Sequence, residues 1–351
     1  MPREILTRGG REFFFRDYSL PDPAPREVRV RVTFAAPKHG TERHTITGSA
    51  FEHRRWDPEL RLFLPQEHPP AAAADREMGN IVAGVVTATG VEVERFRIGD
   101  RVFGYGRIRE EHQTAEDRLY PMENLTAEDA VCTDPAHVAF VAIRDGNIRV
   151  GDRVAVFGLG AIGLMAVQIA RVGGARKVFA VDPLAIRRAA AARLGAIPLD
   201  PSSVDAAFEI KQGTDRKGAD VAVETSGSSA ALHAAIRCIQ QCGTVVHVPW
   251  GPADCSQLHL DQEWHLNRPT LVGSQAWSGW GNPDRDHPLW THERAFQATV
   301  ELFTAGLITG RGVVEPIVLF DEAPAALSRI FSAPETTIKV GLVFPDGEHR
   351  V

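Results

Sequence analysis

The residues with the clearest chemical meaning are three glycines, at positions 158, 160 and 163, that follow a short apolar run. In this spacing the first glycine permits a tight turn, the second lets backbone approach a pyrophosphate, and the third lets a helix lie close to a sheet. The N–H groups that begin such a helix bind phosphate oxygens. The pattern predicts a dinucleotide-binding loop with candidate contacts at Gly158, Leu159, Gly160, Ala161, Ile162 and Gly163.

A carboxylate stands where the ribose of such a dinucleotide would lie. Asp182 ends the apolar run 177–181 and comes nineteen residues after Gly163. A carboxylate there accepts hydrogen bonds from a ribose 2′-OH and repels a 2′-phosphate, which favours NAD over NADP as the cofactor. Arg187 could stack on the adenine ring, or it could be a solvated residue on a helix face.

The second half of the chain alternates apolar runs with amphipathic stretches, which indicates a parallel, doubly wound sheet. The strands are expected at 153–157, 177–181, 219–223, 243–248 and 270–273, and the helices at 161–173, 184–194, 203–212 and 229–240. Ligands bind at the carboxyl ends of parallel strands. Further candidate cofactor contacts are therefore Thr225, Ser226, Val248, Ser274 and Gln275.

The first third of the chain is predicted to be β-rich, because apolar and polar residues alternate with period two along 27–34 and strand-like runs recur at 81–88 and 98–104. Between them, 48–74 is expected to be a surface loop or helix on the substrate side. After residue 290 the pattern of two helices and two strands is expected to return to the first domain. The predicted domains are 1–134 with 286–351, and 135–285.

Composition narrows the class of protein. A chain of 351 residues favours two domains, and a net charge of −6 argues against a nucleic-acid or anionic membrane surface. No apolar run reaches the roughly 18 residues of a membrane span, and the first residues lack a signal-peptide pattern. Four cysteines make no disulfide framework. We expect a cytoplasmic protein, with a homodimer or homotetramer suggested by the exposed edge strand at 270–273.

The order of these segments resembles the medium-chain dehydrogenase/reductase superfamily. The resemblance rests on the glycine loop and on the segments Pro21–Val32, His39–Glu42, Gly79–Val86, Gly99–Val102 and Val150–Val154. It implies an α/β fold, in which a GroES-like β-rich catalytic domain accompanies a Rossmann domain that binds NAD. The segments Gly40–Glu42 and His112–Thr114, with Tyr120-Pro121, are similar to the bacteriochlorophyllide-dehydrogenase-like group.

The chain departs from the zinc-dependent members of that family at the metal ligands. The three ligand positions of those members match His39, Asn80 and Asp134 here. A catalytic zinc needs three protein ligands and one open position, and a neutral asparagine is a poor ligand. The chain therefore resembles a zinc-free branch, and no metal is expected; a weakly held metal at these three residues is the alternative.

Without zinc, oxidation of an alcohol needs a general base, or hydrogen-bond donors that stabilise an alkoxide-like transition state. Lys38 and His39 are the candidates for the group nearest the substrate oxygen. The resemblance implies that Thr41 and His44 relay the proton outward. In the alternative interpretation, His39 only fills the empty metal site.

Other side chains could bind the substrate, and the candidates are Asn80, His112, Asp134, Trp250 and Trp277. His112 could also be structural. Asp134 could instead form an Asp-Pro turn and cap the helix after it, and the tryptophans could belong to a core or a subunit interface. Lys339 resembles a family position that reaches the cofactor pyrophosphate, although it could be a solvated lysine at a strand end.

The combined hypothesis is an NAD-dependent oxidoreductase that interconverts a secondary alcohol and a ketone on a polyol, sugar, cyclitol or similar small molecule. One alternative is a zinc-free reductase of enones or quinones, against which Asp182 counts because that chemistry usually uses NADPH. The other is a nucleotide sensor without turnover, against which the cluster from Lys38 to His44 counts.

Overall fold

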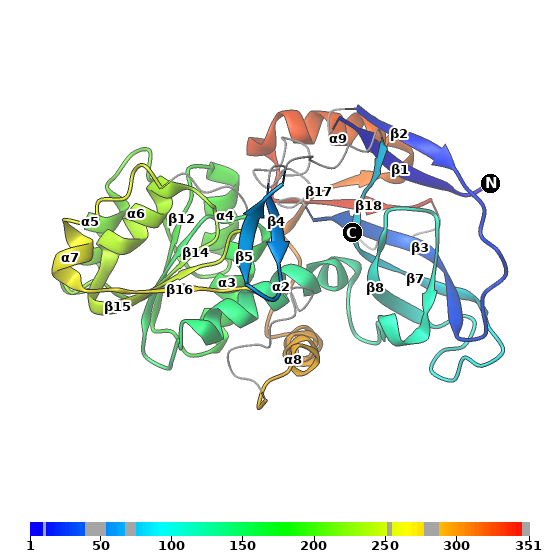
Figure 1. The fold of residues 1–351 in the computed structure, drawn as a ribbon, viewed down its shortest axis with the longest axis horizontal. Helices are drawn as coiled ribbons and strands as arrows, with labels where there is room; N and C mark the ends of the chain where they lie inside the picture. Colours follow the sequence, from blue (N-terminus) through cyan, green and yellow to red (C-terminus); the bar gives the residue numbers. More distant parts are fainter. Residues whose placement is uncertain (10–11, 39–53, 67–74, 251–254, 277–287, 346–351) are drawn as a thin grey trace. The chain divides into compact units, whose positions relative to one another are not determined.

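The computed structural model describes residues 1–9, 12–38, 54–66, 75–250, 255–276 and 288–345 (Figure 1). The chain forms two compact units: Met1–Ser49, Pro69–Asp134 and Thr309–Val351 make the first, and Ala50–His68 with Pro135–Ile308 make the second. These units differ from the expected domain bounds at 50–68 and at 286–308. The second difference arises because α8 (His292–Thr304) contacts the second unit through His292, which lies 3.3 Å from His137 Nε2.

A six-stranded parallel sheet organises the second unit; the alternating pattern predicted a parallel sheet with five of these strands but missed the short one at Ile197–Leu199. Its strand order is β13-β12-β11-β14-β15-β16. The bounds are β11 (Arg153–Phe157), β12 (Lys177–Val181), β13 (Ile197–Leu199), β14 (Ala219–Glu224), β15 (Ile239–His247) and β16 (Thr270–Gly273). The order reverses between β11 and β14, which is the switch point where doubly wound sheets bind ligands.

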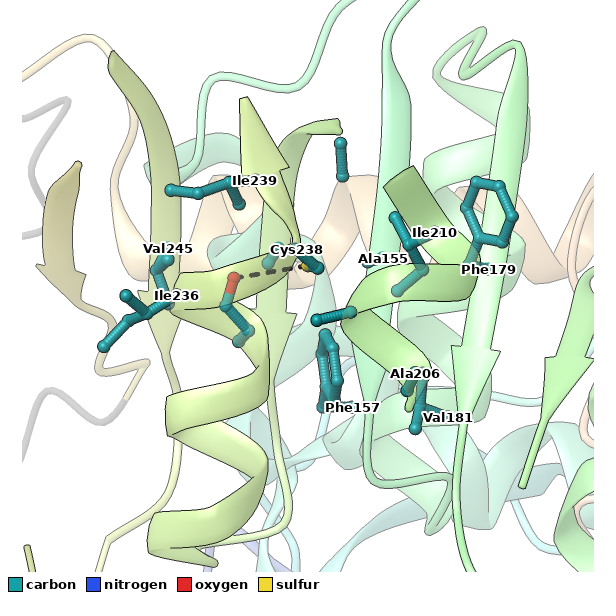
Figure 2. Packing of buried hydrophobic residues seen from close by; sticks show 14 of the residues in the cluster. Ala155, Phe157, Phe179, Val181, Ala206, Ile210, Ile236, Cys238, Ile239 and Val245 are labelled. Atoms are coloured by element: carbon teal, nitrogen blue, oxygen red, sulfur yellow. Dashed lines mark hydrogen bonds between the residues drawn. The ribbon is translucent and has the colours of Figure 1, made fainter. Parts of the chain in front are cut away.

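Helices connect these strands and cover the sheet. They are α3 (Ala161–Val172), α4 (Ala185–Arg193), α5 (Ala206–Gln212), α6 (Ser229–Cys238) and α7 (Glu263–Asn267). Figure 2 shows one packed face, where Phe157 and Phe179 of the sheet meet Ile210 of α5 and Ile236 of α6. Alternate strand residues such as Val156 are fully buried as well, and α3 packs on β11 and β12. The apolar runs are continuous because both faces of the sheet are covered.

The first unit is built mostly on antiparallel strands, and its last two strands pair in parallel. Its main sheet has the order β10-β8-β7-β3-β18-β17, with β9 paired to β3, and a smaller sheet has the order β2-β1-β6. The bounds are β1 (Arg3–Arg8), β2 (Glu12–Asp17), β3 (Glu27–Pro37), β6 (Asp75–Glu77), β7 (Gly79–Thr89), β8 (Arg101–Arg107), β9 (Glu111–Ala115), β10 (Leu119–Pro121), β17 (Val314–Leu319) and β18 (Lys339–Val343). Phe320 and α9 (Ala323–Ser332) pack on its core.

Two segments differ from their sequence-based predictions. Residues 54–66 contain a hairpin of β4 (Arg54–Asp57) and β5 (Leu62–Pro65) rather than a helix. Asp134 and Pro135 lie inside α2 (Ala127–Asp145), so they form neither a turn nor a helix cap. In α2, Thr126 and Asp129 make reciprocal hydrogen bonds that cap its first turn. Within the described residues, no helix combines the length and the apolar character that crossing a membrane requires.

Candidate active site

In the first unit, three polar side chains converge on the carboxylate of Asp134. Lys38 Nζ donates to Oδ1 at 3.1 Å, Tyr105 OH donates to the same oxygen at 3.0 Å, and Asn80 Nδ2 donates to Oδ2 at 3.0 Å. Asp134 is 5% exposed, whereas the side chain of Lys38 is 37% exposed. The structure thus brings together three of the predicted site residues and adds Tyr105 to them.

The strand register explains how residues so far apart in sequence meet. Lys38 directly follows Pro37, the last residue of β3, and Pro37 pairs with Asn80 on β7. On the other side of β7, Tyr105 of β8 pairs with Ile81, next to Asn80. Neighbouring ends of three adjacent strands therefore present their polar side chains together, and α2 supplies Asp134 against them.

The charges in this cluster favour an ionised Asp134. Burial alone would raise the pKa of this carboxyl, but the Lys38 charge, hydrogen bonds from Asn80 and Lys38, and the Lys339 charge together hold its pKa below the usual range. Desolvation, the nearby Asp134 charge and the hydrogen bond to it raise the pKa of Tyr105 far above that of a free tyrosine. Tyr105 therefore stays a neutral hydroxyl at physiological pH.

Lys339 is a buried member of the same neighbourhood. It is 3% exposed, and its Nζ donates to the carbonyl oxygen of Pro37 at 3.0 Å. This contact ties β18 to the end of β3, directly before Lys38. The interpretation of Lys339 as a solvated strand-end lysine is thus wrong, because the side chain is buried; its predicted contact with a pyrophosphate stays a prediction.

The structure describes only two of the remaining predicted residues of the catalytic and substrate sites, His112 and Trp250. His39, Thr41, His44 and Trp277 lie outside the described residues. His112 is 6% exposed, its Nδ1 is 3.1 Å from Arg109 Nη2, and burial lowers its pKa to about 4. Among the described residues it contacts Arg109 rather than the Asp134 cluster, and its role in substrate binding stays a prediction. Trp250 follows β15 in the second unit and is 47% exposed.

The glycine loop of the second unit has the geometry that its spacing predicts. Gly158 has φ +83°, and a side chain there would collide with Ser226. A Cβ on Gly163 would lie 1.8 Å from the carbonyl oxygen of Gly158, so α3 can approach the loop only with glycine there. A Cβ on Gly160 would meet nothing within 4 Å, and no side chain caps the start of α3. The start of α3, with Ala161 and Ile162, thus lacks a capping side chain, and N–H groups at such a helix start can bind phosphate oxygens.

Asp182 is linked to this loop. Its Oδ2 accepts from the backbone N–H of Leu159 at 2.8 Å, and its Oδ1 accepts from the N–H of Leu184 at 2.8 Å. Arg187 Nη1 lies 3.7 Å from Oδ2. Each carboxylate oxygen can accept a second hydrogen bond. The carboxylate therefore braces the loop and keeps acceptor capacity for ribose hydroxyls.

The ends of the next strands hold a buried network that the sequence did not reveal. Glu224 is fully buried; its Oε1 accepts from the N–H groups of Ser226 and Gly227, and its Oε2 lies 3.0 Å from His247 Nδ1. Thr225 Oγ1 donates to the Gly158 carbonyl at 2.8 Å. Thr225 is thus hydrogen-bonded to the glycine loop, and Ser226 packs against Gly158 of that loop. Val248, Ser274 and Gln275 follow β15 and β16 as expected, but their contact with a cofactor stays a prediction.

Few of the described side chains around Asp134 are of types that bind metal ions. Among the described residues, no group of three or more His, Cys, Asp or Glu side chains gathers in a way that could hold a metal ion. Asp134 is accompanied by an ammonium, an amide and a phenol rather than by imidazoles or thiolates.

The chain joins a Rossmann unit that contains this loop to a β-rich unit that contains a polar cluster. This combination defines a class of nicotinamide-dependent oxidoreductases. Comparisons agree: residues 161–284 match the family described as zinc-binding dehydrogenase. The chain is 36% identical over 331 residues to D-guloside 3-dehydrogenase of Escherichia coli K12, covering 91% of this chain and 93% of that protein. The chain belongs to the medium-chain dehydrogenase/reductase superfamily, and it is a dehydrogenase of the medium-chain type.

More distant relatives share this fold. The (R,R)-butanediol dehydrogenase of Bacillus subtilis is 28% identical over 260 residues, covering 65% of this chain and 71% of that protein. A crystal structure of 2R,3R-butanediol dehydrogenase from B. subtilis superposes with a TM-score of 0.75 at 22% identity, covering 98% of this chain and 99% of that one. The predicted two-domain α/β fold class is thereby confirmed.

Proposed function

We propose that this protein uses NAD to interconvert a secondary alcohol and a ketone on a polyol or sugar, with Lys38 rather than a zinc ion beside the substrate oxygen. The observation that carries the proposal is the Lys38–Asp134 ion pair at 3.1 Å in the cluster with Asn80 and Tyr105. The names of the relatives, which include D-guloside 3-dehydrogenase and sorbitol dehydrogenase, support a polyhydroxylated substrate.

The described donors fit a catalytic zinc poorly. Zinc takes thiolate, imidazole and carboxylate ligands, and only Asp134 among the described cluster residues belongs to these types. Its Oδ1 accepts from the ammonium of Lys38, and its Oδ2 accepts from the amide of Asn80. A cation at the carboxylate would displace or repel Lys38. The mechanism that we propose therefore has no step that uses a metal ion.

The cofactor site of the second unit supports NAD. Backbone N–H groups at the start of α3 would hold the pyrophosphate, and Asp182 would accept from the ribose hydroxyls while repelling a 2′-phosphate. When bound, the nicotinamide supplies the hydride chemistry. The buried carboxylate of Asp182 is the feature that favours NAD over NADP.

The residues of the first unit would handle the proton. In ketone reduction, the Lys38 ammonium donates a hydrogen bond to the carbonyl oxygen, stabilises the negative charge that develops there, and passes its proton to that oxygen. In alcohol oxidation, the neutral amine of Lys38 takes the hydroxyl proton. Asp134 holds the Lys38 side chain in place through their contact at 3.1 Å. His39 stays the alternative acid or base, because it lies outside the described residues.

Lys38 variants test this role. Lys38→Met should lower kcat by about 10²- to 10⁴-fold, because general acid–base assistance is typically of that size, while the Kd of NADH stays unchanged. The assays are NAD reduction across a polyol and alcohol panel, NADH oxidation with ketones, and metal analysis of the purified protein. Full activity of Lys38→Met would contradict the proposal. So would stoichiometric zinc, if its removal abolishes turnover and its return restores turnover.

The same assays discriminate the other candidate functions. NADPH oxidation with enones or quinones, without alcohol oxidation, would indicate a reductase of activated double bonds. Tight NAD binding without turnover in either direction would indicate a sensor. A Kd for NADPH equal to that for NADH would contradict the role given to Asp182.

A further inference from the structure

Tyr105 is the exposed member of the Asp134 cluster that has no role in the proposed proton transfer. Its hydroxyl and the Nζ of Lys38 both donate to Oδ1 of Asp134, at 3.0 and 3.1 Å. Since each lies about 3 Å from one atom, the two groups are at most about 6 Å apart. This spacing is short enough for two hydroxyls on neighbouring carbons of one substrate to contact Lys38 and Tyr105 at the same time.

The chemistry of the two groups differs. The ammonium of Lys38 is a donor only, whereas a phenol has one proton and two acceptor lone pairs. Because the pKa of Tyr105 is raised, the phenol keeps its proton, and that proton points to Asp134. What the oxygen of Tyr105 can offer a ligand is thus an acceptor.

Exposure separates Tyr105 from the other polar residue of the cluster. Tyr105 is 44% exposed, whereas Asn80 is 8% exposed and uses its Nδ2 on Asp134. A ligand beside Lys38, whose side chain is also partly exposed, can contact Tyr105 without any rearrangement of the cluster. A polyhydroxylated ligand carries the donor that this acceptor suits, while a simple alcohol does not.

We propose that Tyr105 is a specificity-determining residue that accepts a hydrogen bond from a second hydroxyl, on the carbon next to the one oxidised. This inference rests on the proposed function, since it needs the reacting oxygen at Lys38. It assigns the substrate to the class of vicinal diols, or to α-hydroxyketones in the reverse direction. The two hydroxyls are distinguished by their partners: the oxidised one meets the ammonium, and its neighbour meets the phenol.

The test compares butane-2,3-diol with butan-2-ol, which differ by the second hydroxyl alone. In Tyr105→Phe, kcat/KM for the diol should fall about ten-fold, mostly through KM, because one neutral hydrogen bond is lost from both ground and transition states. The loss of the bond to Asp134 affects both alcohols equally, so the diol-to-alcohol ratio isolates the proposed contact. A calorimetric Kd of the diol for the NADH-loaded protein, which cannot oxidise it, should weaken by a similar factor.

Two further variants complete the design. Tyr18→Phe is the matched control, because its hydroxyl contacts the backbone of Glu111 and no residue of the cluster; the diol-to-alcohol ratio should be unchanged. Tyr105→Trp replaces Tyr105→Phe if that variant does not fold, because an indole N–H is a donor without an acceptor; the diol-to-alcohol ratio should fall in this variant too.

The outcomes separate this inference from the proposed function. An unchanged ratio and an unchanged diol Kd in Tyr105→Phe would overturn the role of Tyr105, while turnover by the wild type would leave the proposed function standing. If the wild type oxidises neither alcohol and the NADH-loaded protein binds no diol, the proposed function fails, and the inference fails with it. Loss of diol preference in Tyr105→Phe alone supports both.

Discussion

Replacing Asp134 with asparagine removes the charge on which the cluster depends while keeping the volume of the side chain. Asp134 is buried and accepts from Lys38, Asn80 and Tyr105. Hydrogen bonds to a charged group contribute about 1.5–3 kcal/mol each, but the partial exposure of Lys38 screens its ion pair. We therefore expect Asp134→Asn to lower the free energy of unfolding by about 2 kcal/mol at pH 7, and kcat by about 10²-fold as Lys38 loses its position.

The pH dependence gives the sharper test. The folded-state pKa of Asp134 is depressed, so its stabilisation is present above the unfolded pKa of about 3.9 and is lost as pH falls through the folded value. Urea titrations of wild type and Asp134→Asn should differ at pH 7 and converge in strong acid. Asp75→Asn, which breaks the exposed ion pair with Arg8, is the control and should cost much less. A difference that is absent at pH 7, or that persists unchanged in acid, would refute this reasoning.

Three further predictions concern both units. Gly163→Ala should destabilise the protein by about 3 kcal/mol, because its Cβ would lie 1.8 Å from the Gly158 oxygen, whereas Gly160→Ala should leave the thermal midpoint unchanged and weaken NADH binding. Asp182→Asn should shift the ratio of the NADPH and NADH dissociation constants about ten-fold toward NADPH, as measured by fluorescence titration. The wild type should lose stability as pH falls from 6.5 to about 4, because the buried imidazole of His112 stays neutral while the unfolded one gains a proton. His112→Gln should not show this loss. That loss is at most about 3 kcal/mol, and chemical denaturation across this range measures it.

The Rossmann unit could be predicted from the sequence because its signals are local. The strand, loop and helix of the glycine motif are contiguous from Arg153 to Val172, and the structure bears out the steric reasons for Gly158 and Gly163. The hydrogen bond from Leu159 to Asp182 could not be predicted from local signals, because it depends on β12 lying next to β11.

The cluster around Asp134 could be predicted only in part. The resemblance indicated Asn80 and Asp134 as former metal-ligand positions, and the need for an acid or base indicated Lys38. Nothing in the sequence indicated that Tyr105 would join them. Its place depends on the register of β8 against β7, and the only local signal was the strand pattern around it. A register shifted by one residue would turn Tyr105 to the other face of the sheet.

The interpretation of Asp134-Pro135 as a turn was wrong for a different reason. Proline disfavours a helix interior, because it lacks an N–H and crowds the preceding turn. Here α2 continues through Pro135 because residues on either side, including Val131, Cys132 and Ala136, are fully buried. The reciprocal cap of Thr126 and Asp129 was readable in the sequence and could have predicted the start of this helix.

The charges around Asp134 connect the cluster to the chemistry we propose. One carboxylate lies among two ammonium groups, Lys38 in direct contact and Lys339 near enough to lower its pKa. With Asp134 ionised, two ammonium groups accompany one carboxylate among the described residues, and Lys38 is the more exposed of the two. Reduction of a ketone builds negative charge on its oxygen, so a fixed cation there stabilises the transition state more than the neutral substrate. A zinc ion does the same work in other enzymes as a Lewis acid; an ammonium also carries the proton that the product needs.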